Sequence, residues 1–78
     1  MGDESIYEEK ARFVRGELTR MLRVATRGVI TGLEYEREGA VETVHVLTVT
    51  QPFAVCVTAD SLFAIVKDVT KAVEACLM

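Results

Sequence analysis

The sequence predicts a single α+β domain of 78 residues, in the order helix, three-stranded antiparallel meander, helix, with both helices on one face of the sheet. Apolar residues recur at helical spacing near both ends of the chain, and the middle is rich in β-branched residues at strand spacing. Two loop signals divide that middle into three runs. A layer of helices is then the natural cover for one apolar sheet face.

The first helix is expected over residues 6–27. Its apolar positions recur at alternating steps of four and three, namely Tyr7, Ala11, Val14, Leu18, Met21 and Ala25. Ser5 followed by Glu8 has the spacing of a capping box at the start of this helix. Gly28 is well placed to end it as a left-handed residue.

The strands are expected over residues 29–36, 41–50 and 53–58. In the first strand, one mainly apolar face is formed by Val29, Thr31, Leu33 and Tyr35. The polar loop 37–40 contains a glycine and predicts a hairpin between the first two strands. Pro52 donates no backbone hydrogen bond, so it separates the second strand from the third.

The second helix is expected over residues 61–77, with Thr58 or Asp60 as its cap. The residues that share its apolar face are Leu62, Ile65, Val66, Val69, Val73, Cys76 and Leu77. The opposite face carries Lys67, Lys71 and Glu74. This pattern is typical of an amphipathic helix packed on a sheet.

The chain is expected to self-associate. Half of its residues are apolar, and a domain of this size has little interior in which to bury them. The second predicted strand has Val44 and Val46 on one side, yet its other side also carries Val41, Leu47 and Val49. A sheet with one solvated face alternates more cleanly. We therefore expect a homo-oligomer whose interface includes sheet residues or the Phe13 side of the first helix.

The first helix also carries a row of arginines on its back, formed by Arg12, Arg20, Arg23 and Arg27. Such a row can contact phosphates, pair with an acidic surface or remain solvated. The net charge of −3 weighs against binding to a polyanion. Pairing with the acidic hairpin of another copy therefore ranks above nucleic acid, and the hairpin residues are Glu34, Glu36, Glu38 and Glu42.

Two further positions on this helix are candidates for contact with a partner. Gly16 lies among the arginines, where it costs about 1 kcal/mol of helix stability relative to alanine. A second helix or a ligand approaching the backbone explains it, and simple tolerance on a surface helix is the alternative. Phe13 lies beside the main apolar stripe and suggests contact with both the sheet and a neighbour, although a wide core face also accounts for it.

The sequence offers no catalytic, cofactor or metal site. His45 is the only histidine, and we interpret it as a structural or interface residue because its same-face neighbour on the strand is Thr43. Cys56 and Cys76 are expected to be buried free thiols rather than a disulfide. One histidine and two separated cysteines also fall short of a structural zinc set. We therefore expect no enzymatic activity.

The order of the elements is shared with double-stranded RNA-binding domains, a likeness of topology that identifies no family. Those domains bind phosphates through lysines that open their second helix. Here the segment 60–63 is Asp-Ser-Leu-Phe, and the first lysine of the helix is Lys67.

The expected location is the cytoplasm. No apolar run approaches the roughly 18 residues of a membrane span, and residues 1–5 lack the basic and apolar regions of a secretory signal. We expect a small non-enzymatic, self-associating protein or interaction module. The alternative is a nucleic-acid-binding accessory protein that uses the arginine face of the first helix.

Overall fold

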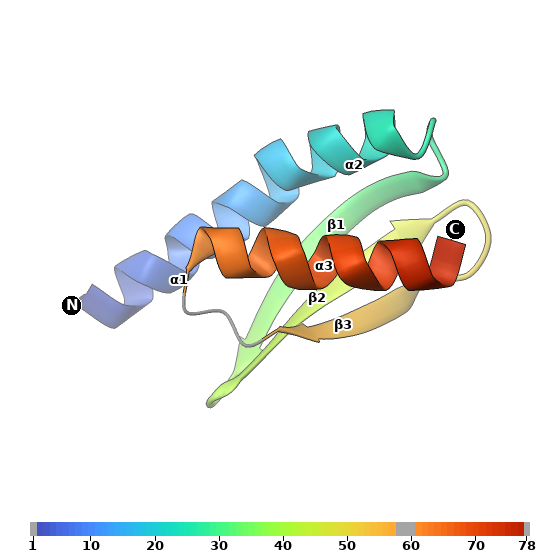
Figure 1. The fold of residues 1–78 in the computed structure, drawn as a ribbon. Coiled ribbons are helices and arrows are strands. Elements are labelled where there is room, and N and C mark those ends of the chain that lie inside the picture. The colour runs from blue at the N-terminus through green and yellow to red at the C-terminus, as the bar shows by residue number, and fades with distance from the viewer. Residues whose placement is uncertain (1, 58–60, 78) are drawn as a thin grey trace.

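The computed structural model describes residues 2–57 and 61–77, which form a layer of helices on one three-stranded sheet (Figure 1). The elements in chain order are α1 (Gly2–Phe13), the π-helical segment η1 (Val14–Leu18), α2 (Thr19–Ala25), β1 (Ile30–Glu38), β2 (Val41–Thr48), β3 (Phe53–Val57) and α3 (Leu62–Leu77). The strands are antiparallel in the order β1-β2-β3. The predicted α+β fold is confirmed.

One hydrophobic core lies between the two layers. The continuous helix formed by α1, η1 and α2 contacts β1, while α3 contacts β3 (Figure 1). The helices bury Val14, Leu18, Leu22, Ile65, Val69 and Val73 against the strand residues Ile30, Leu33, Val44, Val46 and Val57. Both helices therefore cover the same face of the sheet, as the sequence predicts.

The buried line of the first helix differs from the predicted stripe. Val14, Leu18 and Leu22 are buried at steps of four, whereas Met21 is 45% exposed and Ala25 is also exposed. An α-helix turns about 100° per residue, so a step of four overshoots one turn by about 40°. The wider turn of η1 has i→i+5 hydrogen bonds. In the wider turn of η1, four residues make slightly less than one turn. This shortfall offsets the 40° overshoot of the α-helical steps, so Leu22 faces the core.

The start of this helix also differs from the prediction. The helix begins at Gly2 rather than Ile6, so Ser5 lies inside α1 and not at its cap. The backbone of the predicted capping box is therefore helical throughout. A cap at Ser5 is wrong for this reason, because an N-cap residue has a non-helical backbone.

The helix ends at Ala25 in a Schellman motif. The Gly28 N–H donates to the Arg23 carbonyl at 2.8 Å, and the Arg27 N–H donates to the Val24 carbonyl at 3.2 Å. Arg27, with φ of 54°, is the left-handed residue that ends the helix, and Gly28 follows it with φ of 87°. The sequence predicted Gly28 as the left-handed residue that ends the helix, one position after the observed Arg27. Arg27 therefore follows the helix and does not share its arginine face.

A β-bulge at the start of β1 changes which residues face the core. The register shifts between Ile30 and Gly32, which adds one residue to β1 relative to β2. Ile30 and Leu33 are both buried, although they are three residues apart. Val29 and Thr31 are exposed, contrary to the predicted alternation. The bulge shifts the inward–outward alternation by one residue. Before the bulge, the residues predicted to face the core therefore face solvent, and Ile30 faces the core instead.

The remaining boundaries are close to those predicted. β1 and β2 are joined by Gly39 and Ala40, and Gly39 adopts the left-handed conformation with φ of 64°. Ser61 caps α3, because its Oγ accepts a hydrogen bond from the Ala64 N–H at 3.2 Å. The predicted caps, Thr58 and Asp60, lie outside the described residues.

The second face of the sheet is open. Val41 and Leu47 of β2 are exposed on it, while Val44 and Val46 are buried on the inner face. No element in the described ranges packs on this outer face. In the same ranges, no helix has both the length and the apolar character needed to cross a membrane.

The buried line of the first helix is testable by comparing two neighbouring residues. We expect Leu22→Ala to lower the free energy of unfolding by about 2–4 kcal/mol, because it leaves a cavity in the core. Met21→Ala should cost less than about 1 kcal/mol, because that side chain is half exposed. Urea denaturation measures both losses, and the exposed Lys67→Ala serves as a control expected to stay within about 0.5 kcal/mol. A larger loss for Met21→Ala would favour the stripe predicted from the sequence.

Candidate functional site

The predicted arginines are exposed on the outside of the first helix. Arg12 lies on α1, and Arg20 and Arg23 lie on α2. Arg27 leaves this face because it follows the end of the helix. Arg15, which was absent from the predicted row, is exposed on η1 and takes its place. We call Arg12, Arg15, Arg20 and Arg23 the arginine surface.

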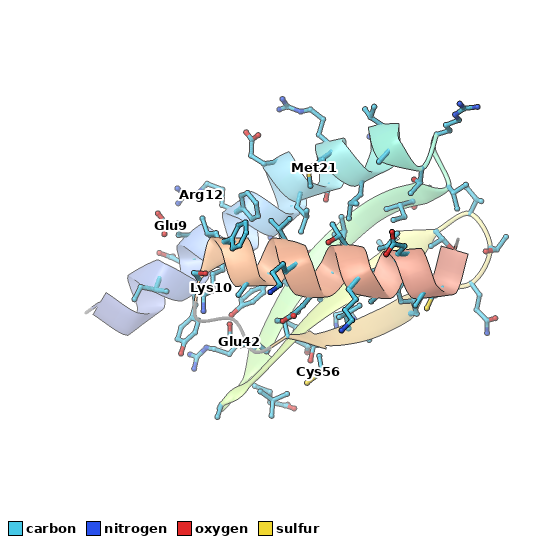
Figure 2. The ribbon with its side chains drawn as sticks, in the orientation of Figure 1. Glu9, Lys10, Arg12, Met21, Glu42 and Cys56 are labelled. Carbon is cyan, nitrogen blue, oxygen red and sulfur yellow. The ribbon has the colours of Figure 1, made fainter. Side chains whose placement is uncertain are left out.

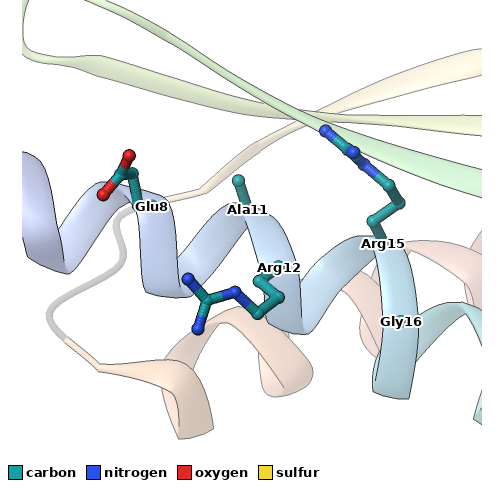
Figure 3. Close-up of a pocket in the computed structure, with 5 residues that line it drawn as sticks. All are labelled: Glu8, Ala11, Arg12, Arg15 and Gly16. Carbon is teal, nitrogen blue, oxygen red and sulfur yellow. The ribbon is translucent and has the colours of Figure 1, made fainter.

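Gly16 lies at the centre of the arginine surface. Three open hollows, of about 460, 500 and 350 Å³, share this residue. The first is lined by Arg12 and Arg15 (Figure 3), the second by Arg15, Arg20 and Arg23. Figure 3 shows Arg12 and Arg15 extending in different directions from the helix, with Glu8 in the same hollow and the bare backbone of Gly16 next to Arg15. The structure thus places Gly16 on one surface with Arg12, Arg20 and Arg23 of the predicted row, but not with Arg27.

The fold itself does not require glycine at position 16. A Cβ built there meets no atom within 4 Å, and the residue has no positive φ. Glycine nevertheless costs a helix about 1 kcal/mol relative to alanine. Its backbone is open to a group from outside the domain, which is a setting in which glycine permits close approach.

The π-helical turn around Gly16 is stabilised locally by Thr19. The Thr19 hydroxyl donates to the Val14 carbonyl at 2.7 Å, and the Thr19 N–H donates to the carbonyls of Val14 and Gly16. These bonds satisfy backbone groups that the wide turn leaves out of the α-helical pattern. Single π-helical turns occur frequently at functional sites.

Phe13, the other candidate on this helix, packs mainly on its own chain. It is half-buried against the core and lines the third hollow together with Leu62 of α3. Phe13 therefore belongs mainly to the wide core face of the first helix.

The outer face of the sheet carries an acidic row on β1. Glu34, Glu36 and Glu38 alternate on this edge strand and are exposed. In the register, Glu34 lies opposite His45. The His45 Nε2 contacts the diagonal Glu36 Oε1 at 2.6 Å. His45 therefore has a carboxylate partner on its own face, which the sequence pattern did not indicate.

An apolar hollow of about 490 Å³ lies beside this acidic row. Its apolar walls are formed by Leu47 of β2, Phe53 and Ala54 of β3 and the adjoining Pro52. Glu34 and His45 form its polar side. We call this hollow, together with Glu34, Glu36 and Glu38, the open sheet surface.

The two surfaces meet around the edge of β1. The Arg15 Nε lies 3.9 Å from the Glu34 Oε1, and both side chains are largely exposed. An exposed pair of this kind contributes little stability. It does show that an arginine of the helix and a glutamate of the sheet can meet across this edge.

Glu42 does not belong to the acidic row, because it lies on the inner face of the sheet. Its Oε1 accepts hydrogen bonds from the Lys10 Nζ at 3.0 Å and from the Tyr35 hydroxyl at 2.5 Å. The side chains of Lys10 and Glu42 are only 7% and 13% exposed. The Tyr7 ring lies 5.1 Å from the Lys10 Nζ and stacks with the Arg37 guanidinium at 3.8 Å. Figure 2 shows Lys10 on α1 near Glu42 at one end of the sheet.

Burial and hydrogen bonding shift two pKa values in this network. Burial opposes ionisation of Glu42, but hydrogen bonds from Tyr35 and Lys10, with the Lys10 and Arg37 charges, outweigh it and lower the Glu42 pKa. Burial, followed by the hydrogen bond to Glu42 and its negative charge, raises the Tyr35 pKa well above its usual range. Glu42 is therefore held as a carboxylate and Tyr35 as a neutral donor.

Both cysteines are free but exposed, so the prediction that they are buried is wrong. Cys56 lies on β3 and points away from the helices (Figure 2). Cys76 lies in the last turn of α3. Among the described residues, no group of three metal-ligating side chains is close enough to hold an ion.

Comparison of the chain with protein-family models, with curated proteins and with solved structures finds no match.

The buried network generates a stability prediction. We expect Glu42→Gln to lower the free energy of unfolding by about 3 kcal/mol, because it removes the negative charge that lies 3.0 Å from the nearly buried Lys10 ammonium. Glu36→Gln on the exposed face is the matched control and should cost less than about 0.5 kcal/mol. Chemical denaturation at neutral pH measures both, and equal losses would contradict the structural role of Glu42.

The same variant should alter the response to acid. Because the Glu42 pKa is lower in the folded state than its ordinary value of 4.5, its carboxylate stabilises the fold above that pH. This contribution is lost as the pH falls through the folded pKa. The wild type should therefore lose stability more steeply below pH 4.5 than Glu42→Gln.

Proposed function

We propose that this protein is a small, non-enzymatic, self-associating interaction module. The observation that carries the proposal is the open sheet surface, where Leu47 and the neighbouring apolar hollow are exposed beside charged residues. Only one face of the sheet is covered by the described helices. An apolar patch rimmed by polar residues is typical of a protein interaction site.

The setting of His45 supports the non-enzymatic part of the proposal. Its imidazole pairs with Glu36 on an exposed strand rather than inside an enclosed cleft. General acid-base catalysis depends on a positioned group within reach of a bound substrate. An exposed cross-strand pair is better suited to an interface contact.

Binding of nucleic acid by the arginine surface is the second candidate function. The hollow lined by Arg15, Arg20 and Arg23 favours it, because several guanidinium groups surround an open space next to bare backbone. Arginine forks match phosphate geometry well. The net charge of −3 opposes it, because the field of the whole molecule repels a polyanion.

Self-association is tested by sedimentation of the wild type. We expect species larger than a monomer at tens of micromolar, with an interface that buries at least about 1,000 Å² in total. Leu47→Lys should weaken the association, because it places a charge in the apolar part of the open sheet surface. Phe63→Lys changes a 75% exposed residue of α3 and is the matched control. A monomeric wild type would refute the proposed function.

Nucleic-acid binding is tested by titration with short DNA and RNA duplexes. We expect no binding by the wild type near physiological salt, because its net charge is negative. If phosphates do bind, affinity should fall steeply with salt, and each lost arginine should reduce the salt slope by about one unit. Binding lost in Arg20→Glu/Arg23→Glu but kept in Lys67→Glu/Lys71→Glu, with the oligomer intact, would establish the second candidate instead.

A further inference from the structure

We infer that the arginine surface of one copy binds the open sheet surface of a second copy, so that the protein associates head to tail. This inference rests on the proposed self-association and names the two surfaces that make it. The contact joins the helix around Gly16 to the edge strand β1 of the neighbour.

The two surfaces have opposite charge. The open sheet surface presents Glu34, Glu36 and Glu38, all exposed. On the helix, Glu8, Glu9 and Glu17 accompany Arg12 in two of the hollows. The positive charge is therefore concentrated at the hollow lined by Arg15, Arg20 and Arg23, which has no carboxylate in its lining. Arginine pairs with carboxylate through two parallel hydrogen bonds when geometry allows. Complementary charge of this kind selects the partner and fixes how it docks.

Each surface also has an apolar part next to its charges. On the helix, Met21 is 45% and Val24 is 76% exposed, and Val24 lines the hollow next to Arg20 and Arg23. On the sheet, the hollow next to Glu34 is walled mainly by apolar side chains, among them Leu47. Burial of apolar area supplies the attraction that exposed ion pairs lack.

Gly16 fits a contact of this type. It follows Val14 by two residues, and Val14 faces the core, so Gly16 faces away from the sheet of its own chain. The space above it is empty, because a side-chain Cβ at this position would meet no atom within 4 Å. A strand of a second copy can therefore approach the backbone there more closely than at any residue with a side chain.

Charge argues against symmetric contacts of either surface with itself. Two arginine surfaces facing each other would bring Arg20 and Arg23 of both copies together, and two open sheet surfaces would do the same for Glu34 and Glu36. Like charges placed together across an interface are unfavourable. The pairing of unlike surfaces avoids both conflicts.

We infer a heterologous arrangement, in which the helix layer of one copy contacts the sheet layer of the next and the same two surfaces are not paired reciprocally. A bound pair leaves one arginine surface free on one copy and one open sheet surface free on the other, so the contact propagates into a closed ring or an open chain. The exposed Arg15–Glu34 pair at 3.9 Å within one chain is then available for exchange with the neighbouring copy.

A mixing experiment tests this polarity. Arg20→Ala/Arg23→Ala removes the arginine surface, and Glu34→Thr/Glu36→Thr removes the acidic row while keeping residues suited to a strand. Each variant alone should associate at least tenfold more weakly than the wild type in sedimentation. Lys67→Ala/Lys71→Ala removes the same charge from α3 and should associate like the wild type. Circular dichroism and urea denaturation verify that each variant is folded.

The two variants mixed in equal amounts should form a 1:1 complex that does not grow further. The intact arginine surface of the glutamate variant can bind the intact glutamates of the arginine variant, and no second contact remains. Native mass spectrometry measures this stoichiometry. A mixture that stays monomeric while the wild type associates would overturn the head-to-tail contact and leave the proposed function standing.

Two other results would also decide the question. If the wild type is a monomer, the proposed function fails and this inference fails with it. If either variant alone forms the wild-type assembly, its surface is not part of the interface and the inference is overturned. Loss of nucleic-acid binding in the arginine variant, with unchanged self-association, would assign the arginine surface to nucleic acid.

Discussion

The structure depends on the packing of two amphipathic helices against one face of a three-stranded sheet. Leu18 and Ile65 are both fully buried in this contact, one from each helix. A chain of 78 residues forms no further layer within the described ranges. The outer face is therefore left with Leu47 and the acidic row in contact with solvent. Both the stability of the monomer and its proposed capacity to associate follow from this one-sided burial.

At one end of the sheet, the polar network around Glu42 adds to the apolar contact between the helices and the sheet. It ties Lys10 of α1 to Tyr35 of β1 through one carboxylate. A buried pair of this kind adds little net stability, but loss of one partner is costly because the other charge stays buried. The network therefore fixes how α1 lies on the sheet. It also removes Lys10 and Glu42 from the charges that are exposed at the surface.

The candidate surfaces were predicted in part. Exposure of Arg12, Arg20 and Arg23 followed from helical spacing, and so did their proximity to Gly16. Arg15 was left out of the predicted row although it follows Arg12 by three residues, and only the folded geometry of η1 and β1 brings it to Glu34. The acidic hairpin was predicted as one cluster, yet strand alternation places Glu42 on the inner face. That separation was readable from the period of two in a strand.

The sequence alone determined the order of the elements, the apolar sides of β2 and α3, and the hairpin turn at Gly39, because these follow from local periodicity and backbone preference. Tertiary structure decided where that periodicity is interrupted. The π-helical turn selects Leu22 over Met21, and the β-bulge selects Ile30 over Thr31. Neither the π-helical turn nor the β-bulge is indicated by a local sequence pattern. Each forms because it brings large apolar side chains into the shared core. The Lys10–Glu42 contact spans 32 residues, and only the folded chain brings its two charges together.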